Sequence, residues 1–307
     1  MKGSGLGLRV LVPVLIVTLP AFTQEQSAPP NAEQRGEVPV DTQMTLDAAP
    51  PLQKPVIRSI IYLRCQKTNM KGTGFVVSEG VVVTAAHVTC GCDAGDLEGR
   101  TTLGQPVEFS RLARDEDRDL AALRPKESLQ GGLELATDAN AGMGERVNTW
   151  GFPLIYNGPA PLLSVGYVSG YYQARADNFC DPTRNPKNLK FKHVVVNGAF
   201  NPGNSGGPLF VFGQNKVIGV VIWKRIAFTD LVKEAIKGFH HPAASTGGTF
   251  SERQPDRTFK WVSDQEVIAR VLEEFYNKVQ VDIGEAVSVS ELRAFLKEHA
   301  TELSLPN

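Results

Sequence analysis

Short apolar runs separated by turn residues dominate the chain between positions 55 and 228. Many of the apolar residues are β-branched, and turn-forming clusters such as 78–80 (SEG) and 213–215 (GQN) lie between the runs. This pattern is typical of many short strands packed into a barrel or a sandwich. The predicted strands lie at 56–63, 74–77, 81–84, 120–123, 147–150, 165–169, 193–196, 208–212 and 217–223. The pattern predicts an all-β domain over 55–228.

The pattern changes after residue 228. Apolar residues recur at helical spacing in 230–239, 263–280 and 288–303, and Ser288 or Ser290 can cap the last of these segments. Gly, Ser, Pro and Thr are frequent between 240 and 256, which predicts a loop there. We therefore expect a helical C-terminal extension over 229–307.

The first residues have the pattern of an export signal. Lys2 and Arg9 supply positive charge, an apolar run follows at 10–19, and small and polar residues come next. A membrane-spanning helix needs roughly 20 apolar residues, and this run is shorter, is interrupted by Pro13 and is followed by Pro20. We predict a signal peptide over 1–23, cleaved near Thr23, rather than a membrane anchor. The mature protein is expected in a periplasm or outside the cell, with no stable membrane insertion.

Residues 24–54 are rich in Pro, Ala, Gln and Glu and nearly free of aromatics. Such a composition buries little apolar surface, which predicts a flexible leader. The charge of the whole chain is almost balanced, with 32 Lys and Arg against 33 Asp and Glu and a net charge of -1. This balance gives no electrostatic reason to expect a nucleic-acid partner.

Four cysteines fit an oxidising compartment: Cys65, Cys90, Cys92 and Cys180. Four thiols allow three complete pairings, and the sequence does not choose among them. A bond from Cys65 to Cys90 or Cys92 would close a loop around His87, worth about 3 kcal/mol in the chain-entropy model. Cys90 and Cys92 form a C-x-C rather than the C-x-x-C usual for zinc, so disulfides are predicted and no metal site is.

The strongest chemical signal is the segment 201–208 (NPGNSGGP). Glycines on both sides of Ser205 allow a tight turn that exposes the hydroxyl and aims main-chain N–H groups at one point. Acyl transfer requires such donors, because negative charge develops on the carbonyl oxygen in the transition state. Ser205 is thus the candidate nucleophile, and the N–H groups of Gly203 and Ser205 are the candidate oxyanion donors. The alternative is a glycine-rich turn with an incidental serine.

A nucleophilic serine needs a base and a group that orients the base. His87 ends the segment 84–87 (TAAH) after an apolar strand, where a histidine can project into a cleft. Asp119 opens the apolar strand 119–123 and is the candidate orienting carboxylate. A structural histidine and a strand-initiating aspartate are the alternatives. The charged residues just before Asp119 are expected to form a solvated turn: Arg114, Asp115, Asp117 and Arg118.

The order His87, Asp119, Ser205, each in a β setting, resembles the trypsin-like serine proteases and, among them, the bacterial HtrA-type exported proteases. The matching stretches are 72–75, 84–88, 119–123, 164–170 and 199–209. The resemblance implies two packed antiparallel six-stranded β-barrels, at about 55–137 and 142–228. It also implies a serine endopeptidase that cleaves polypeptides without a cofactor. No PDZ domain is recognisable in the rest of the chain.

The same resemblance places five residues at the primary specificity pocket. Ala199 stands at its base, so the pocket lacks a carboxylate for Lys or Arg, and Phe200 narrows it. The strand that pairs with substrate corresponds to Ile222, Trp223 and Lys224, with Lys224 at the pocket mouth. We expect cleavage after small aliphatic residues.

Two other functions compete with this hypothesis. Residues 203–207 also satisfy G-x-S-x-G, the nucleophile elbow of α/β-hydrolases. That elbow needs a helix directly after the serine, whereas 208–212 is a predicted strand. The second competitor is a catalytically silent or latent protease-fold protein that serves as a binding module or scaffold. The presence of all three side chains and both glycines favours the enzyme.

Overall fold

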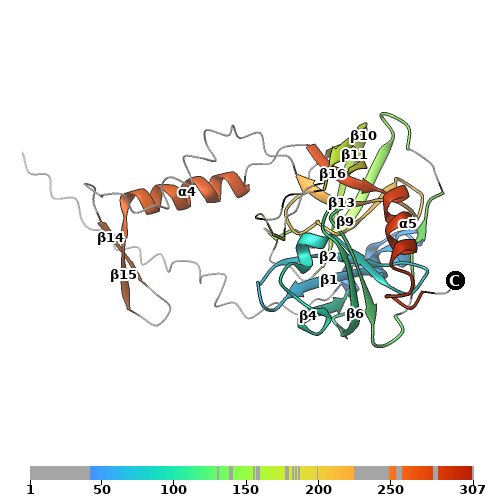
Figure 1. Cartoon of the computed structure of the whole chain (residues 1–307), viewed down its shortest axis with the longest axis horizontal. Coiled ribbons are helices and arrows are strands. Elements are labelled where there is room, and N and C mark those ends of the chain that lie inside the picture. The colour runs from blue at the N-terminus through green and yellow to red at the C-terminus, as the bar shows by residue number, and fades with distance from the viewer. Residues whose placement is uncertain are drawn as a thin grey trace, which may run out of the picture. The chain divides into compact units, whose positions relative to one another are not determined.

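A computed structural model gives the fold of residues 42–129, 131–137, 141–154, 156, 160–176, 180–181, 183, 185, 187–198, 200–224, 249–253, 258–278 and 283–305 (Figure 1). The predicted signal peptide, the first part of the predicted leader and the predicted helix at 230–239 lie outside these residues. Among the residues described, no helix combines the length and apolarity needed to cross a membrane.

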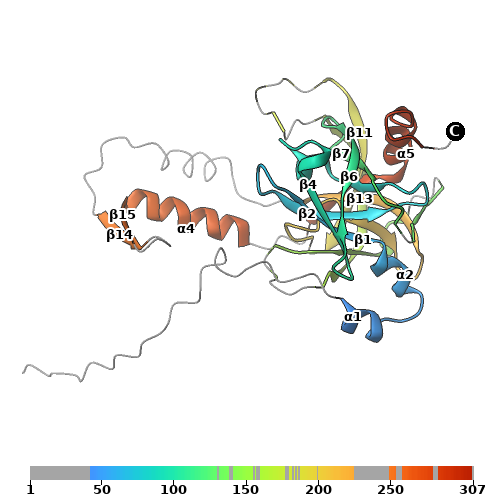
Figure 2. The same ribbon diagram turned by 90° about the horizontal axis from the view of Figure 1, so that it is seen from below.

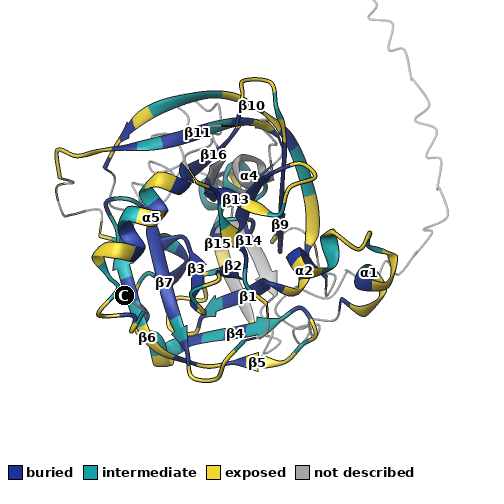
Figure 3. Cartoon of the chain, turned by 90° about the vertical axis from the view of Figure 1, so that its right-hand side faces the viewer, coloured by how far each residue is buried: buried dark blue, intermediate teal, exposed yellow. Residues whose placement is uncertain are grey.

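The first barrel is built from one seven-stranded sheet in the order β5-β4-β1-β2-β3-β7-β6. Its strands are β1 (Ile60–Cys65), β2 (Lys71–Val76), β3 (Val82–Thr84), β4 (Leu97–Thr101), β5 (Pro106–Val107), β6 (Phe109–Asp115) and β7 (Leu120–Pro125). Two short 3-10 helices, η1 (Ala86–Thr89) and η2 (Ala94–Asp96), connect β3 to β4. β3 is buried along its whole length and β7 at all but one position, as the dark blue of Figure 3 shows. Strands buried on both faces are continuous apolar runs, which explains why the sequence pattern located them.

The second barrel is closed. Its sheet has the order β12-β9-β10-β11-β16-β13-β8, and an additional pairing of β12 with β13 joins six of these strands into a ring. The strands are β8 (Glu134–Leu135), β9 (Arg146–Gly151), β10 (Leu162–Arg175), β11 (Lys190–Gly198), β12 (Pro208–Val211), β13 (Lys216–Lys224) and β16 (Ile283–Ser288). The predicted turn at 213–215 joins β12 to β13, and Gly213 supplies its positive φ of 80°. The predicted architecture of two antiparallel barrels is confirmed.

The predicted β domain does not end at residue 228. β16 pairs with β11 on one side and with β13 on the other, so the second barrel needs a strand from within the predicted extension. The segment 229–307 is therefore not purely helical. It contains α4 (Asp264–Lys278) and α5 (Val289–Glu298) as expected, together with β16 and the hairpin of β14 (Thr249–Arg253) and β15 (Phe259–Ser263). The boundary at 228 is wrong because backbone pairing, not local apolar pattern, recruits β16.

The predicted leader is also shorter than expected. Residues 42–58 contain two short helices, α1 (Gln43–Ala48) and α2 (Gln53–Arg58), next to β1 (Figure 2). Leu46 is 2% exposed and belongs to the apolar cluster of the first barrel. The indole N–H of Trp150 on β9 donates to the side-chain oxygen of Gln53 at 3.1 Å. Packing on both barrels thus provides the burial that the segment's own composition lacks.

Candidate active site

His87 and Asp119 meet in the first barrel through two hydrogen bonds. His87 lies in η1 just after β3, and Asp119 lies in the turn just before β7. The ring Nδ1 of His87 is 2.8 Å from Oδ2 of Asp119, and the backbone N–H of His87 donates to Oδ1 at 2.9 Å. The Asp119 side chain is 4% exposed, whereas the His87 side chain is 20% exposed. A buried carboxylate on Nδ1 fixes the tautomer in which Nε2 accepts a proton.

The electrostatics of this pair suit a general base. Burial of the His87 ring lowers its pKa, but the charge of Asp119 and the hydrogen bond to it outweigh this effect. The pKa of His87 is therefore raised above the ordinary value of histidine. A raised pKa strengthens the ring as a proton acceptor.

The turn that carries Asp119 is not solvated as the sequence suggested. Asp117 is 6% exposed, and the side chain of Arg118 is 14% exposed. One carboxylate oxygen of Asp115 accepts the N–H groups of Asp117 and Arg118, each at 3.1 Å. Asp119 itself has a φ of 57°, in the left-handed region that aspartate tolerates better than most residues. The expectation of a solvated turn is wrong because ion pairs to distant parts of the chain bury these charges.

Ser205 lies in the loop between β11 and β12, and contacts from both barrels hold this loop. The carbonyl of Ser205 accepts the N–H of Thr73 from the first barrel at 2.9 Å. The Ser205 hydroxyl donates to the carbonyl of Ile222 in the second barrel at 3.3 Å. A Cβ on Gly206 would lie 2.1 Å from the Thr73 carbonyl and 2.9 Å from the N–H of Ala85. The loop thus packs directly against the segment that leads into His87.

The N–H groups of Gly203 and Ser205 are the predicted oxyanion donors. No described residue accepts a hydrogen bond from the N–H of Gly203 or of Ser205. Gly203 has a φ of 98°, and its carbonyl accepts the Thr73 hydroxyl at 2.6 Å. A Cβ at this position would lie 2.2 Å from the carbonyl oxygen of Phe152, so only glycine fits. Two unpaired N–H groups beside a serine hydroxyl form the donor set that a developing oxyanion requires.

The residues predicted to form the specificity pocket lie in different parts of the structure. Ala199 lies outside the described residues, and Trp223 and Lys224 pair through their backbones with Glu285 and Gly284 of β16. Phe200 is 1% exposed and packs in the apolar interior of the second barrel. Its ring lies on Gly284, where a Cβ would come within 2.2 Å of the ring. The sequence analysis missed Gly284, because nothing local marks a glycine in an unrecognised strand.

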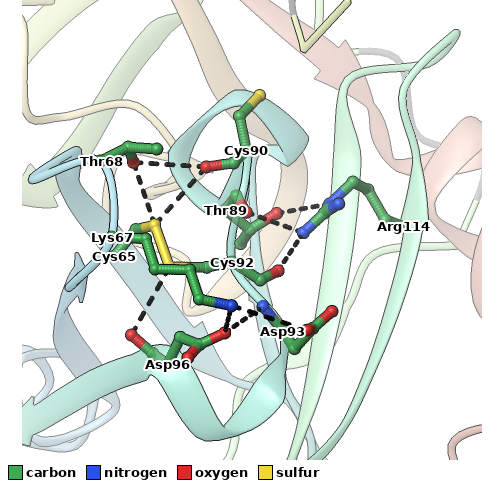
Figure 4. Close-up of polar contacts among 9 residues, drawn as sticks. All are labelled: Cys65, Lys67, Thr68, Thr89, Cys90, Cys92, Asp93, Asp96 and Arg114. Carbon is green, nitrogen blue, oxygen red and sulfur yellow. Dashed lines mark hydrogen bonds and ion pairs between the residues drawn. A yellow bond between two sulfur atoms is a disulfide. The ribbon is translucent and has the colours of Figure 1, made fainter.

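Two disulfides flank His87 and settle the pairing that the sequence left open. Cys65 bonds to Cys92, one of the two partners considered for it, and Cys90 bonds to Cys180 between β10 and β11. Figure 4 shows the guanidinium of Arg114 on the segment between them, with donation to the carbonyls of Thr89 and Cys92 at 2.7 and 2.6 Å. Within the described part of the chain, no group of three or more His, Cys, Asp or Glu residues is placed to hold a metal ion.

Comparison with known proteins assigns this arrangement to a family. Residues 72–220 match the family model of the trypsin-like peptidase domain, and this stretch contains His87, Asp119 and Ser205. This region of the chain is therefore similar to the trypsin-like peptidase domain. The family match ends before β16, so in this protein the protease domain extends beyond it to the strand that completes the second barrel.

The protease domain has distant relatives among characterised and solved proteins. It is 28% identical over 156 residues to a probable periplasmic serine endoprotease, DegP-like, of Hahella chejuensis, which covers 50% of this chain and 30% of the relative. It is 30% identical over 210 residues to Protease Do-like 1, chloroplastic, of Arabidopsis thaliana, covering 64% of this chain and 44% of the relative. The chain thus spans less than half the length of either relative.

A solved structure supports the fold alone. The active form of the Rv3671c protease from M. tuberculosis superimposes with a TM-score of 0.56 at 18% identity, covering 84% of this chain and 86% of that one. The coverage of this chain exceeds that of the family model, consistent with a protease domain that includes part of the C-terminal segment.

Proposed function

We propose that this protein is a serine endopeptidase in which Ser205 is the nucleophile, His87 the general base and Asp119 the residue that orients His87. The observation that supports this most is the double hydrogen bond from His87 to a buried Asp119, beside a serine loop with two unpaired N–H donors. A structural histidine would not require such a loop nearby. The proposed substrates are polypeptides.

The chemistry follows from these positions. The Ser205 hydroxyl turns from the Ile222 carbonyl toward His87, and its oxygen attacks the substrate carbonyl carbon as Nε2 takes the proton. The N–H groups of Gly203 and Ser205 bind the oxyanion of the tetrahedral intermediate. His87 then gives the proton to the leaving amine as the peptide bond breaks, which leaves an acyl-enzyme. Water attacks the acyl carbon as His87 takes its proton, and His87 then returns that proton to the Ser205 oxygen as the ester bond breaks and the carboxylic acid product leaves.

We further propose a preference for small aliphatic residues before the cleaved bond. We infer from the resemblance to trypsin-like proteases that Phe200 lies beside the base of the pocket that receives the side chain before the cleaved bond. Phe200 is buried against Gly284 and caps the apolar interior of the second barrel there. We infer that a ring beside the base of the pocket favours a short side chain before the cleaved bond.

Export is the third part of the proposal. The two disulfides are stable in an oxidising compartment, and the related bacterial proteases are named periplasmic. We propose that residues 1–23 are a signal peptide and that the protein acts in a periplasm or outside the cell.

Labelling of the disulfide-intact protein with a fluorophosphonate probe tests the proposed activity. We expect covalent labelling at Ser205 that both Ser205→Ala and His87→Ala abolish. Labelling that persists in Ser205→Ala would refute the assigned nucleophile. An unlabelled, folded parent protein would instead favour the alternative of a silent or latent protease-fold binding protein.

A further inference from the structure

Arg118, the residue directly before Asp119, connects three parts of the molecule. Its Nη1 and Nη2 bind the two carboxylate oxygens of Glu298 in α5 at 2.5 and 2.8 Å. Nη1 is also 3.1 Å from Asp115 in its own turn, and Nε is 3.8 Å from Glu291 at the start of α5. The guanidinium carbon lies 5.2 Å from the ring centroid of Phe191 on β11. One side chain thus joins the Asp119 turn to α5 and to the second barrel.

The Asp119 turn needs such an external constraint. A non-glycine residue with a φ near 57° is strained and keeps this conformation only where its surroundings enforce it. Within the turn, the Asp115 carboxylate accepts hydrogen bonds from the N–H groups of Asp117 and Arg118. Arg118 binds the other oxygen of that carboxylate and anchors it to α5. A two-point guanidinium–carboxylate contact fixes orientation as well as distance.

We propose that Arg118 is a positioning residue whose two-point contact with Glu298 holds Asp119 against His87. The inference rests on the proposed function. It assigns α5 a role in catalysis, although Glu298 lies 180 residues after Arg118 in the sequence. Arg118 does not touch substrate. It acts on the geometry of the pair formed by Asp119 and His87.

An ordinary stabilising ion pair would behave differently. Exposed ion pairs contribute little, and their loss leaves the active-site geometry intact. Arg118 is 14% exposed at its side chain, whereas Glu298 is 51% exposed. Glu298 can therefore be replaced without opening the core, which separates positioning from folding.

The test compares Glu298→Gln with a matched control, Glu302→Gln. Glu302 is 52% exposed, lies just beyond the same helix and pairs through its side chain with His299 at 2.8 Å rather than with the Asp119 turn. In Glu298→Gln we expect kcat to fall by roughly 10-fold with little change in KM, less than the ~10² that a 1 Å misplacement can cost. Glu302→Gln should match the parent.

A second measurement separates this inference from the proposed function. The pKa of His87 is followed by NMR titration in the Ser205→Ala background, which requires no turnover. Asp119 raises this pKa against the effect of burial, so displacement of Asp119 should lower it in Glu298→Gln and in Arg118→Lys. An unchanged pKa of His87 in both folded variants would overturn the positioning role. This outcome does not depend on the fluorophosphonate labelling, which tests the proposed activity.

Discussion

Three residues at the active site hold backbone conformations that side chains rarely adopt. Asp119, Gly203 and Gly206 have φ values of 57°, 98° and 85°. Two of them are glycines for a steric reason, because a Cβ would collide with Phe152 or Thr73. The third carries the proposed orienting carboxylate. Rare backbone conformations concentrated where chemistry is proposed are typical of a preorganised site.

Replacement of Asp119 by asparagine tests the orienting role, because it changes one carboxylate oxygen to an amide nitrogen. Asparagine tolerates the left-handed conformation, so the turn should persist, but its amide no longer favours the required tautomer of His87. We expect kcat to fall by roughly 10³–10⁴-fold with a folded protein. Asp47→Asn, at an exposed helical position, should keep full activity. Full activity in Asp119→Asn would reject the triad.

Replacement of Gly203 by alanine tests the oxyanion donor. The new Cβ would collide with the Phe152 carbonyl and displace the N–H, with an expected loss of about 10²–10³ in kcat. Gly213→Ala is the control, since it also has a positive φ but meets no atom within 4 Å. The control should lose about 1–2 kcal/mol of stability and no activity. Equal activity losses in both variants would point to backbone strain rather than to a donor.

The pH dependence of catalysis follows from the raised pKa of His87. His87 must be neutral to accept the Ser205 proton, so activity is lost as pH falls through this pKa. We expect the acidic limb of kcat/KM to lie above about 6.5, the unperturbed value. Steady-state rates between acidic and alkaline pH give the limb directly, and a midpoint well below 6 would contradict the role of Asp119.

At the scale of elements, the sequence predicted the strands that are continuous apolar runs and missed a strand that depends on pairing with distant strands. The buried strands β3 and β7 were found because their runs are continuous. β16 was missed because Gly284 and Glu285 interrupt its pattern. Glu285 is 4% exposed, and the hydroxyl of Tyr172 donates to it at 2.5 Å. A buried carboxylate satisfied from another strand cannot be recognised from its own neighbours.

The site shows the same division. Ser205, His87 and Asp119 lie beside glycines or at strand ends that mark them locally, so the sequence alone is enough to propose them. Gly284 and the contact of Arg118 with Glu298 depend on segments that meet only in the fold. The pairing of the cysteines likewise depended on which loops lie together.

The contact between Phe200 and β16 makes a prediction about specificity. Phe200→Ala should open the proposed pocket and shift cleavage toward larger aliphatic or aromatic residues before the cut bond. Profiling on a peptide library measures the shift. Phe212→Ala is the matched control, because that ring is 43% exposed and packs under Arg146. A parent enzyme that cleaves after Arg, or an unchanged profile in Phe200→Ala, would argue against this pocket.

At the scale of the whole molecule, the two disulfides constrain the chain very differently. Cys65–Cys92 spans 27 residues within the first barrel, whereas Cys90–Cys180 spans 90 and links the segment after His87 to the second barrel. In the chain-entropy model the longer loop stabilises more. Replacing Cys90 and Cys180 together by serine should therefore cost about 2–5 kcal/mol, measured by urea unfolding. A larger loss from the Cys65 and Cys92 pair would contradict the loop-length argument.

The closure of the second barrel by β16 has a consequence for biogenesis. β13 ends at residue 224 and β16 begins at residue 283, so the ribosome must reach residues 283–288 before the ring can form. Until then β11 and β13 each present an unpaired edge, which can recruit strands from other chains. A product terminated early would carry Ser205, His87 and Asp119 in a barrel that cannot close. The proposed proteolytic activity should therefore require the distant residues 283–288 as well as the three proposed catalytic side chains.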